Sequence, residues 1–484
     1  MFYPSKQEFE NLAKEHNLVP VYAEIVADID TPVSAHMKLG ESDYSFLLES
    51  VEGAERWARY SLLGQDPYLV ITCKNGEAKV VENGQIKTEK GDPLEVLKRY
   101  LGALKPAVLP ELPPFQGGAV GYLSYDAVRY IEEIPKNAKE DVVYPDAVFM
   151  LTDTILIFDH LKHKIKVVVN AKIDGPEGEV YEKATRKIES LIAKLNKLQP
   201  ARALTEPATE PADIDSNIGK EDFIKAVEKA KDYIVAGDII QVVLSQRFSL
   251  PLKNREPFDV YRLLRTLNPS PYMYYVTLKD FKLIGCSPEA LVKVQDDVVT
   301  TRPIAGTRRR GNDEAEDFAF EEEMKNSEKE KAEHLMLLDL GRNDLGRVCE
   351  TGSVMVDEFM KVEKYSHVMH MVSSVTGSLA KGKDAFDVLK ATFPAGTVSG
   401  APKIRAMQII DELEPTLRGP YAGAVGYFSY SGNLDSAIAI RTVIVKDGIA
   451  YIQAGAGIVY DSDSEQEYKE CLNKARALFK ALGD

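Results

Sequence analysis

Apolar positions along the chain follow two different spacings, and each spacing predicts its own kind of element. A spacing of two, rich in Val, Ile and aromatic residues, is typical of strands, whereas spacings of three and four are typical of helices. The predicted strands include 19–27, 46–48, 148–158, 164–170 and 239–250, and the predicted helices include 5–17, 93–104, 177–198 and 220–236. Both kinds of element are therefore predicted along the chain.

One strand pattern occurs twice, as GGAVGYLSY at 117–125 and as AGAVGYFSY at 422–430. Glycines between apolar and aromatic residues are typical of strands that another backbone or ring approaches closely. The repeat reflects either independent use of such a strand or two similar halves that contribute equivalent strands to one core. We expect an α+β fold with two similar halves, in which large, mostly antiparallel β-sheets pack as a sandwich with helices on the outside.

The segment 199–219, QPARALTEPATEPADIDSNIG, lacks apolar periodicity and is rich in Pro, Ala and Thr. Such a composition predicts a linker. It divides the chain into an N-terminal region, 1–198, and a C-terminal region, 220–484.

A helix predicted at 327–341 carries a carboxylate on its apolar side. Ser327 and Glu330 have the spacing of a capping box, and Gly341 is expected to end the helix. Between them, Glu333 shares a face with apolar residues at i+3, i+4 and i+7. A buried carboxylate needs a cation, a hydrogen-bond network or a proton, so Glu333 is either a structural ion-pair partner or a functional group.

A second acidic helix is predicted near the C-terminus, where Ser464 repeats the capping pattern. Glu467 and Glu470 lie on one edge of its apolar stripe, and Lys474 follows one turn later. Together with Glu333, these carboxylates would suit Mg²⁺, which takes one or two protein carboxylates and leaves positions for an anionic ligand. The alternative, which spacing alone favours, is a solvated pair of Glu470 and Lys474.

Composition excludes several classes of protein. The 484 residues carry a formal net charge of −15, which argues against a nucleic-acid groove. The four cysteines are far apart and form no C-x-x-C, so neither a zinc site nor a disulfide framework is indicated. Because a signal peptide and a long apolar span are also missing, we expect a soluble, unexported, cytoplasmic protein.

Glycine-rich loops near the C-terminus do not have the spacing of known nucleotide sites. Residues 301–311 and 393–403 lack the P-loop spacing G-x-x-x-x-G-K-[ST], and AGAGIV at 454–459 is not G-x-G-x-x-G. These loops are either ordinary tight turns or places where backbone N–H groups approach a small anion.

Seven segments together resemble the chorismate-utilising enzyme family. They are GCSPEALVKV, TRPIAGTRRRG, EKAEHLMLLDLGRNDLGRV, HVMHMVSSVTG, FPAGTVSGAPKIRAMQIIDELEP, AIAIRTVIV and IQAGAGIVYDSDSEQEYKECLNKA. The resemblance covers nearly everything after the linker. It implies that 220–484 is a chorismate-binding catalytic region. The motif LLES at 47–50 extends it, less densely, to a regulatory region at 1–198.

Two positions separate members of this family. In isochorismate-forming members, a lysine that activates water occupies the position of Gln241, and in aminodeoxychorismate-forming members a nucleophilic lysine occupies the position of Ala305. This chain has neither amine, so its pattern is similar to that of members that use ammonia and form anthranilate.

The resemblance implies an Mg²⁺-dependent lyase that converts chorismate and ammonia into anthranilate and pyruvate, the first committed step of tryptophan biosynthesis. It implies that Glu289 protonates the departing C4 hydroxyl and that His370 acts near the leaving group; without the family, His370 would be interpreted as a satisfied core histidine. It assigns the metal to Glu333, Glu467 and Glu470, directly or through water. The substrate-binding positions that it implies are Thr301, Gly306, Thr307, Thr397, Tyr421, Arg441, Gly455, Gly457 and Lys474.

The resemblance also implies regulation and a partner. The positions that match tryptophan-binding elements, and hence predict feedback inhibition, are Glu49, Ser50, Pro271, Tyr272 and Met273. No G-x-C-x-G nucleophile segment is present. Use of glutamine is therefore expected to need a separate glutamine amidotransferase subunit, in an assembly with two copies of each chain.

Three alternatives remain open from the sequence. Two are an aminodeoxychorismate synthase and an isochorismate-type synthase with altered nucleophile positions. The third is a catalytically silent protein that keeps the fold and senses tryptophan, although the intact set of acidic residues, His370 and Arg441 speaks against it.

Overall fold

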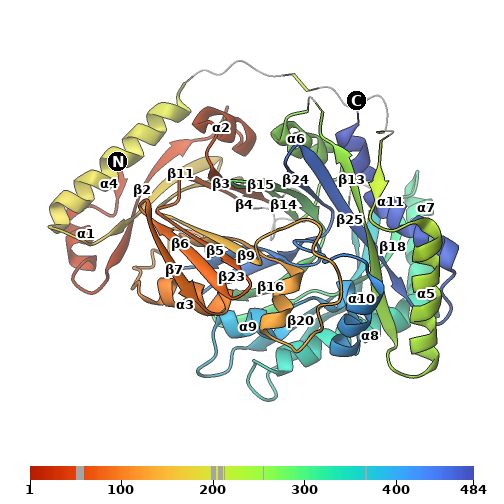
Figure 1. Cartoon of the computed structure of the whole chain (residues 1–484). Helices are drawn as coiled ribbons and strands as arrows, with labels where there is room; N and C mark the ends of the chain where they lie inside the picture. Colours follow the sequence, from red (N-terminus) through yellow and green to blue (C-terminus); the bar gives the residue numbers. More distant parts are fainter. Residues whose placement is uncertain are drawn as a thin grey trace.

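Two large antiparallel sheets form the protein. The computed structural model describes residues 1–50, 59–197, 203–204, 211, 213–253, 255–365 and 368–483. Within these residues, one sheet has thirteen strands and the other has twelve. The sheets form two layers, and helices lie on their outer sides (Figure 1). The expected α+β sandwich is confirmed.

The first half of the chain supplies about half of each sheet, from one edge to the centre. Its elements are, in order, β1 (Phe2–Tyr3), α1 (Lys6–Leu12), β2 (Leu18–Val26), α2 (Pro32–Leu39), β3 (Tyr44–Glu49), β4 (Tyr60–Gln65), β5 (Leu69–Lys74), β6 (Glu77–Glu82), β7 (Gln85–Lys90), α3 (Pro93–Gly102), β8 (Gly118–Leu123), η1 (Tyr125–Tyr130), β9 (Ala147–Thr152), β10 (Thr154–Asp159), β11 (Lys164–Lys172) and α4 (Glu177–Leu195).

The second half repeats this order with additions. Its elements are β12 (Asp215–Ser216), α5 (Lys220–Val235), β13 (Gln241–Pro251), α6 (Pro257–Leu267), β14 (Tyr272–Leu278), β15 (Phe281–Ser287), β16 (Ala290–Gln295), β17 (Val298–Thr301), β18 (Ile304–Arg309), α7 (Glu314–Asn326), α8 (Glu328–Gly346), β19 (Met355–Lys364), β20 (Val368–Ser378), α9 (Ala385–Thr392), η2 (Gly396–Val398), β21 (Gly400–Ala401), α10 (Lys403–Leu413), β22 (Ala424–Ser429), β23 (Leu434–Ile438), β24 (Thr442–Lys446), β25 (Ile449–Ile458) and α11 (Ser464–Leu482).

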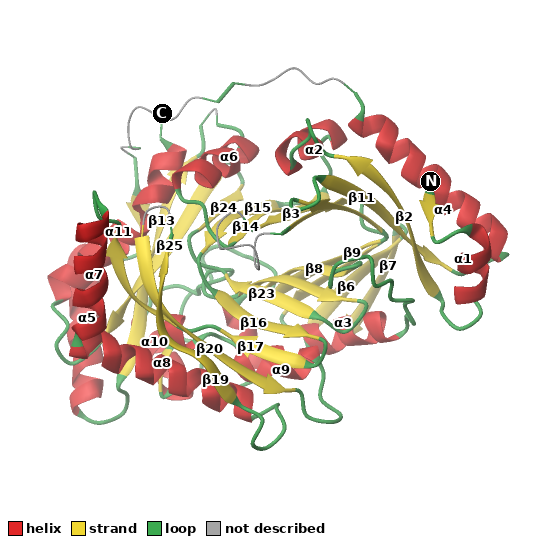
Figure 2. Ribbon diagram, turned by 180° about the vertical axis from the view of Figure 1, so that it is seen from behind, coloured by secondary structure: helices red, strands yellow, loops and turns green. Residues whose placement is uncertain are grey.

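The two halves correspond strand by strand. In the first sheet, the order β2-β11-β10-β4-β3 from the first half continues as β14-β15-β24-β25-β13 from the second, which is the same chain order reversed. In the second sheet, β8-β9-β5-β6 likewise meets β22-β23-β16-β17. The halves are therefore related by an approximate two-fold axis, and β18, α7, α8 and β19 are an addition to the second half alone. Figure 2 shows α7, α8 and β19 of this addition.

The repeated GAVGY segments lie on this axis. They form β8 and β22, which pair antiparallel with Gly121 directly opposite Gly426. These two glycines are equivalent in the repeat, so the pairing is symmetric about them. This confirms the interpretation that two similar halves contribute equivalent strands to one core.

Three apolar cores explain why the strands are so rich in Val, Ile and Leu. One core lies between the sheets and includes Phe46, Tyr122 and Val276. The others lie between the sheets and the helices: α1, α2, α4, α6 and α11 cover the first sheet, α3, α8 and α9 cover the second, and α5 and α10 pack against β13 of the first sheet. A strand buried on both faces reads as a continuous apolar run, as in β10, whose six residues are all buried.

Among the helices of the described residues, none has the length and apolar character needed to cross a membrane.

Helix α8 is longer than predicted. Ser327 caps it by accepting a hydrogen bond from the Glu330 N–H at 3.3 Å, as expected. Gly341, however, does not end the helix, which continues to Gly346. A glycine inside a helix costs only about 1 kcal/mol relative to alanine. A Cβ at Gly341 would lie 3.2 Å from the Thr301 methyl group, so this glycine serves packing.

Three smaller boundaries also differ. Asp463, not Ser464, caps α11, and the Ser464 hydroxyl donates to Glu228 instead. The strand predicted at 148–158 is two strands, β9 and β10, which separate at Asp153 and enter different sheets. Helix α4 ends at Leu195.

The expected linker falls largely outside the described residues, and the part at 213–219 contains β12, which pairs with β13. Because strands from both sides of the linker share both sheets, the regions 1–198 and 220–484 have common cores.

Candidate active site

Glu289 is a buried carboxyl group between β15 and β16. Only 9% of its surface is exposed, and its carbonyl oxygen accepts a hydrogen bond from the Ile438 N–H at 3.1 Å. Burial raises the pKa of the Glu289 carboxyl to about 7, against the opposing effects of the nearby Thr397 hydroxyl and Lys474 ammonium. The Thr397 oxygen is itself buried and makes no hydrogen bond of normal geometry to the described residues. Segments more than 100 positions apart thus surround this carboxyl.

Lys474 links several of the predicted site residues. From α11, its ammonium donates to the carbonyl oxygen of Gly455 at 3.0 Å and forms an ion pair with Glu470 at 2.7 Å. The Arg441 guanidinium donates to the carbonyl oxygen of Lys474. Arg441 has a φ of 51°, which is uncommon for a residue other than glycine, and burial lowers the pKa of its guanidinium. Two cations are therefore held close together beside β25.

The two acidic helices come together at this place. Burial raises the pKa of Glu333 on α8, and the cations that oppose this shift include Lys474 of α11. Burial also raises the pKa of Glu467 on α11, and the opposing cations include Lys329 of α8. Because each carboxylate feels a lysine of the other helix, Glu333 and Glu467 share one electrostatic environment.

The donor chemistry of these carboxylates fits a hard divalent cation. Mg²⁺ commonly uses one or two protein carboxylates and completes its ligands with water and substrate oxygens. Glu333 and Glu467, the two half-buried carboxylates of this group, supply such oxygens, and Glu470 is the exposed third. In the described part of the chain, no three His, Cys, Asp or Glu side chains form a group that could hold a metal ion by themselves.

Two glycines of β25 give side chains room at the bottom of the site. A Cβ at Gly457 would lie 2.6 Å from the Gln241 amide nitrogen, and a Cβ at Gly455 would lie 2.9 Å from the Tyr421 hydroxyl. The Gln241 amide, in turn, lies near Glu333 and opposes the rise in the pKa of its carboxyl. The glycines therefore let Gln241 and Tyr421 approach the strand that faces the acidic helices.

A second group of predicted residues lies on the neighbouring strands β18 and β20. His370 pairs in register with Thr307, and its Nδ1 lies 3.0 Å from the Thr307 hydroxyl. Gly306 has a φ of 70°, and a Cβ there would lie 2.8 Å from a carboxylate oxygen of Glu330. Thr301, at the end of β17, donates to the Leu291 carbonyl oxygen at 3.3 Å. These strands flank α8, which carries Glu333.

The predicted regulatory residues meet where β3 of the first half pairs with β14 of the second. Glu49 is directly opposite Met273 in this pairing. The Glu49 carboxylate is 5% exposed and accepts hydrogen bonds from Tyr261 at 2.5 Å and from Arg265 at 3.2 Å. The charge at the end of β3 is thus balanced by α6.

Ser50 and Tyr272 differ in their partners. The Ser50 hydroxyl is buried without a hydrogen-bond partner among the described residues. Tyr272, which follows Pro271, donates to Asp435 of β23 at 3.0 Å and so connects the two sheets. Residues 51–58, which follow Ser50, lie outside the described part of the chain.

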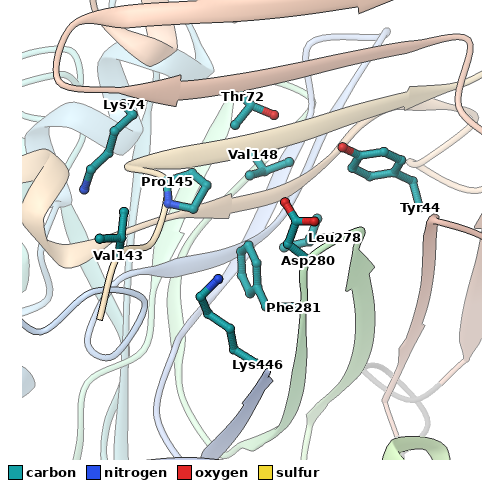
Figure 3. Close-up of a pocket in the computed structure, with 10 residues that line it drawn as sticks. All are labelled: Tyr44, Thr72, Lys74, Val143, Pro145, Val148, Leu278, Asp280, Phe281 and Lys446. Atoms are coloured by element: carbon teal, nitrogen blue, oxygen red, sulfur yellow. The ribbon is translucent and has the colours of Figure 1, made fainter. Parts of the chain in front are cut away.

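A cavity of about 300 Å³ lies elsewhere, at the opposite end of β3 (Figure 3). Its lining includes Tyr44, Asp280 and Lys446, together with apolar side chains such as Phe281. None of the described residues that line it belongs to the predicted site.

The structure adds site residues that the sequence patterns did not single out. Gln241 was interpreted only as a missing lysine, yet its amide lies near Glu333 and opposes the rise in the pKa of that carboxyl. Arg418 and Glu414 have the i,i+4 spacing of an exposed ion pair, but both are buried. Lys329 of α8 acts on Glu333 of its own helix and on Glu467 of α11. In the sequence, the only signal for the buried pair of Glu414 and Arg418 is the Gly and Pro residues of ELEPTLRGP, which indicate a turn there.

Comparison with known proteins identifies the family of this chain. Residues 44–480 match the family model described as chorismate binding enzyme. The chain is 50% identical to anthranilate synthase component 1 of Acetivibrio thermocellus, over 100% of this chain and 99% of that protein. It is 48% identical to the component 1 of Aquifex aeolicus, over 99% and 97% of the two chains.

Solved structures agree as well. The crystal structure of anthranilate synthase component I from Streptococcus pneumoniae TIGR4 superimposes with a TM-score of 0.80 at 42% identity, covering 94% of this chain and 99% of that one. The menaquinone-specific isochorismate synthase of Escherichia coli has the same fold, with a TM-score of 0.72 at 20% identity over 98% and 99% of the chains. The chain therefore belongs to the chorismate-binding enzyme family, within the group of anthranilate synthase component 1.

Proposed function

We propose that this enzyme converts chorismate and ammonia into anthranilate and pyruvate. The observation that carries the proposal is the buried carboxyl of Glu289, whose pKa of about 7 keeps a large fraction protonated at neutral pH. An exposed glutamate, with a pKa of about 4.3, would be almost fully ionised there. Glu289 can therefore donate a proton to a departing hydroxyl group.

The nitrogen nucleophile is proposed to come from solution or from a partner. Gln241 and Ala305 stand where related enzymes have the lysines that activate water or attack the ring. Ammonia would form a bond to C2 while the C4–O bond breaks and the hydroxyl leaves as water with the proton of Glu289. Loss of the C2 proton and of the enolpyruvyl group as pyruvate would then give the aromatic ring, with His370 near the leaving group.

Binding of the dianionic substrate is proposed to use the cations and carboxylates of the same site. Arg441 and Lys474 would pair with substrate carboxylates. Mg²⁺, held by Glu333, Glu467 and Glu470 directly or through water, would supply positive charge that neutralises a carboxylate of chorismate. Thr301, Gly306, Thr307, Thr397, Tyr421, Gly455 and Gly457 would complete the substrate-binding surface.

Turnover of chorismate by the purified chain tests this proposal. With ammonium and Mg²⁺, the product should have the fluorescence and mass of anthranilate, and EDTA should abolish its formation until Mg²⁺ is restored in excess. An aminodeoxychorismate or isochorismate product would favour the two alternative synthases. Tryptophan binding without any turnover would favour a sensor.

We also propose a glutaminase partner. The relatives are named component 1, which implies a second component. The isolated chain should use ammonium but not glutamine, and addition of a glutamine amidotransferase subunit should confer glutamine-dependent turnover. Turnover of glutamine by the chain alone would contradict this proposal.

Tryptophan is proposed as a feedback inhibitor that binds at Glu49, Ser50, Pro271, Tyr272 and Met273. The hydroxyl of Ser50 supports it, because it is buried without a hydrogen-bond partner among the described residues, and an unpaired buried polar group is available to a ligand. We expect Ser50→Ala to raise the tryptophan concentration for half-inhibition roughly tenfold, the size of one lost hydrogen bond, with kcat unchanged. Ser45→Ala, in the preceding strand β3, should alter neither the tryptophan concentration for half-inhibition nor kcat. Unchanged tryptophan sensitivity of Ser50→Ala would count against the site.

A further inference from the structure

Arg418 is the largest fully buried side chain among the described residues and lies in the turn before β22. Its guanidinium is 2% exposed and pairs with Glu414 through two hydrogen bonds, Nε to Oε2 at 2.9 Å and Nη2 to Oε1 at 2.6 Å. Glu414 also accepts hydrogen bonds from the Ser245 N–H and hydroxyl, both at 2.8 Å. An ion pair this deeply buried gains little net stability over apolar packing, so its value depends on what else it holds.

The remaining donors of Arg418 bind two segments of the candidate site. Nη1 donates to the carbonyl oxygen of Val398 at 2.7 Å, and Nη2 donates to that of Val243 at 2.7 Å. Val398 directly follows Thr397, whose hydroxyl faces Glu289. Val243 pairs in register with Gly457. One guanidinium thus ties η2 to β13.

The same guanidinium lies over two aromatic rings. Its central carbon lies 4.7 Å from the ring centre of Tyr125 and 5.6 Å from that of Tyr421. Tyr421 is the residue whose hydroxyl approaches Gly455. A planar fork can hydrogen-bond at its edge and stack on both faces at once, which the single ammonium of lysine cannot do.

We propose that Arg418 is a positioning residue for the reaction, because it sets Thr397, Tyr421 and β13 relative to one another around the substrate. This inference rests on the proposed function. Arg418 is not a catalytic residue, since it acts through these neighbours. Replacement of Arg418 should displace Thr397 and Tyr421 even in a variant that still folds.

The pH dependence of turnover distinguishes positioning from simple stability. The groups that act on the Glu289 carboxyl are Thr397 of η2 and Lys474 of α11, and both oppose the rise in its pKa. If Thr397 moves away, the pKa of Glu289 rises further. Because the general acid works when protonated, the fall in kcat/KM at alkaline pH should then begin at a higher pH.

The test compares Arg418→Lys with Lys166→Met in the full chain, using chorismate, ammonium and Mg²⁺. Lys166 is a matched control in the other half, because it is buried, pairs with Glu24 at 2.7 Å and lies over the Tyr22 ring. Arg418→Lys should lower kcat roughly 10- to 100-fold, as misplaced catalytic groups do, and shift the alkaline limb upward. Lys166→Met should lower the melting temperature but leave kcat and the pH profile unchanged.

If Arg418→Lys does not fold, Glu414→Gln keeps the shape of the pair, loosens the guanidinium and should cause a smaller shift in the same direction. An unshifted alkaline limb in the folded variants, or equal losses of kcat in Arg418→Lys and Lys166→Met, would overturn the assignment of Arg418. Absence of chorismate turnover in the unaltered chain would overturn the proposed function itself, and the role of Arg418 with it.

Discussion

Single side chains in this protein acquire their properties from segments distant in sequence. Glu289 has an ordinary local context, a carboxylate after a proline between two strands. Its raised pKa comes from burial, and the groups that moderate it, Thr397 and Lys474, come from η2 and α11. A carboxyl group held in this way can serve as an acid at neutral pH, at a cost to the stability of the fold.

Glu289→Gln should therefore stabilise the fold while removing activity. Below about pH 4.5 the carboxyl is protonated in both the folded and unfolded states, so its pKa has no effect there. As the pH rises to about 7, the unfolded chain ionises first and the wild-type free energy of unfolding falls. Relief of this penalty should make the Gln variant more stable by about 1 to 3 kcal/mol at pH 8 and equal to wild type near pH 4.5.

Urea unfolding at the two pH values measures this difference, and kcat should fall about 10²- to 10⁴-fold. Glu465→Gln, at an exposed carboxylate, is the control and should change neither quantity. A Gln variant that loses stability at pH 8 would contradict the account of Glu289.

At the scale of elements, the sequence predicted what depends on local pattern. The apolar stripe of α11 is buried as expected at Cys471, Ala475 and Leu478. The predictions failed where a distant contact decides the outcome. Gly341 was expected to end α8, but the helix continues because the missing side chain makes room for Thr301. Likewise, no local signal showed that β9 and β10 enter different sheets.

Candidate site residues followed the same rule. Helical spacing singled out Glu333 and Lys474, and family motifs supplied Glu289, whereas no sequence pattern singled out Arg418. Its burial depends on Tyr125 of the first half and on β13, and neither is visible from the spacing of ELEPTLRGP.

Gly341→Ala tests the packing of α8 against Thr301. The added methyl group favours the helix by up to about 1 kcal/mol but must push against the Thr301 methyl group at 3.2 Å. We expect a higher KM for chorismate, because Thr301 is proposed to line the substrate site. Gly346→Ala, on the same helix with open space around it, should leave KM unchanged. Steady-state kinetics measures the two KM values. Equal values in both variants would show that Thr301 does not line the substrate site.

At the scale of the whole molecule, the two halves cannot be separated without cutting both sheets. The junctions β3–β14 and β8–β22 join strands from different halves by continuous hydrogen bonding. The proposed tryptophan site lies at the first junction, and Tyr272 and Asp435 connect it to the other sheet. The fold should therefore unfold as one cooperative unit, because the regions 1–198 and 220–484 share its sheets and cores.

Gly121→Ala should show this cooperativity. A Cβ at Gly121 would collide with the carbonyl oxygen of Val148, which β8 cannot avoid without losing its place beside β9. We expect the free energy of unfolding to fall by more than about 2 kcal/mol, as for other overpacked cores. Calorimetry should show a single transition at a lower temperature. Gly102→Ala, at an open position of α3, should leave the transition near its original temperature. Two resolved transitions would show that the halves unfold separately.

The approximate two-fold axis limits where such a chain can vary. Strands beside the axis face their own counterparts, so a change of length or register in one requires a matching change in the other. The outer ends of the sheets carry no such restriction, and the segment from β18 to β19, which brings Glu333, was accommodated there without a counterpart in the first half. Evolutionary novelty in this architecture is thus expected at the periphery, while the centre is inherited nearly unchanged.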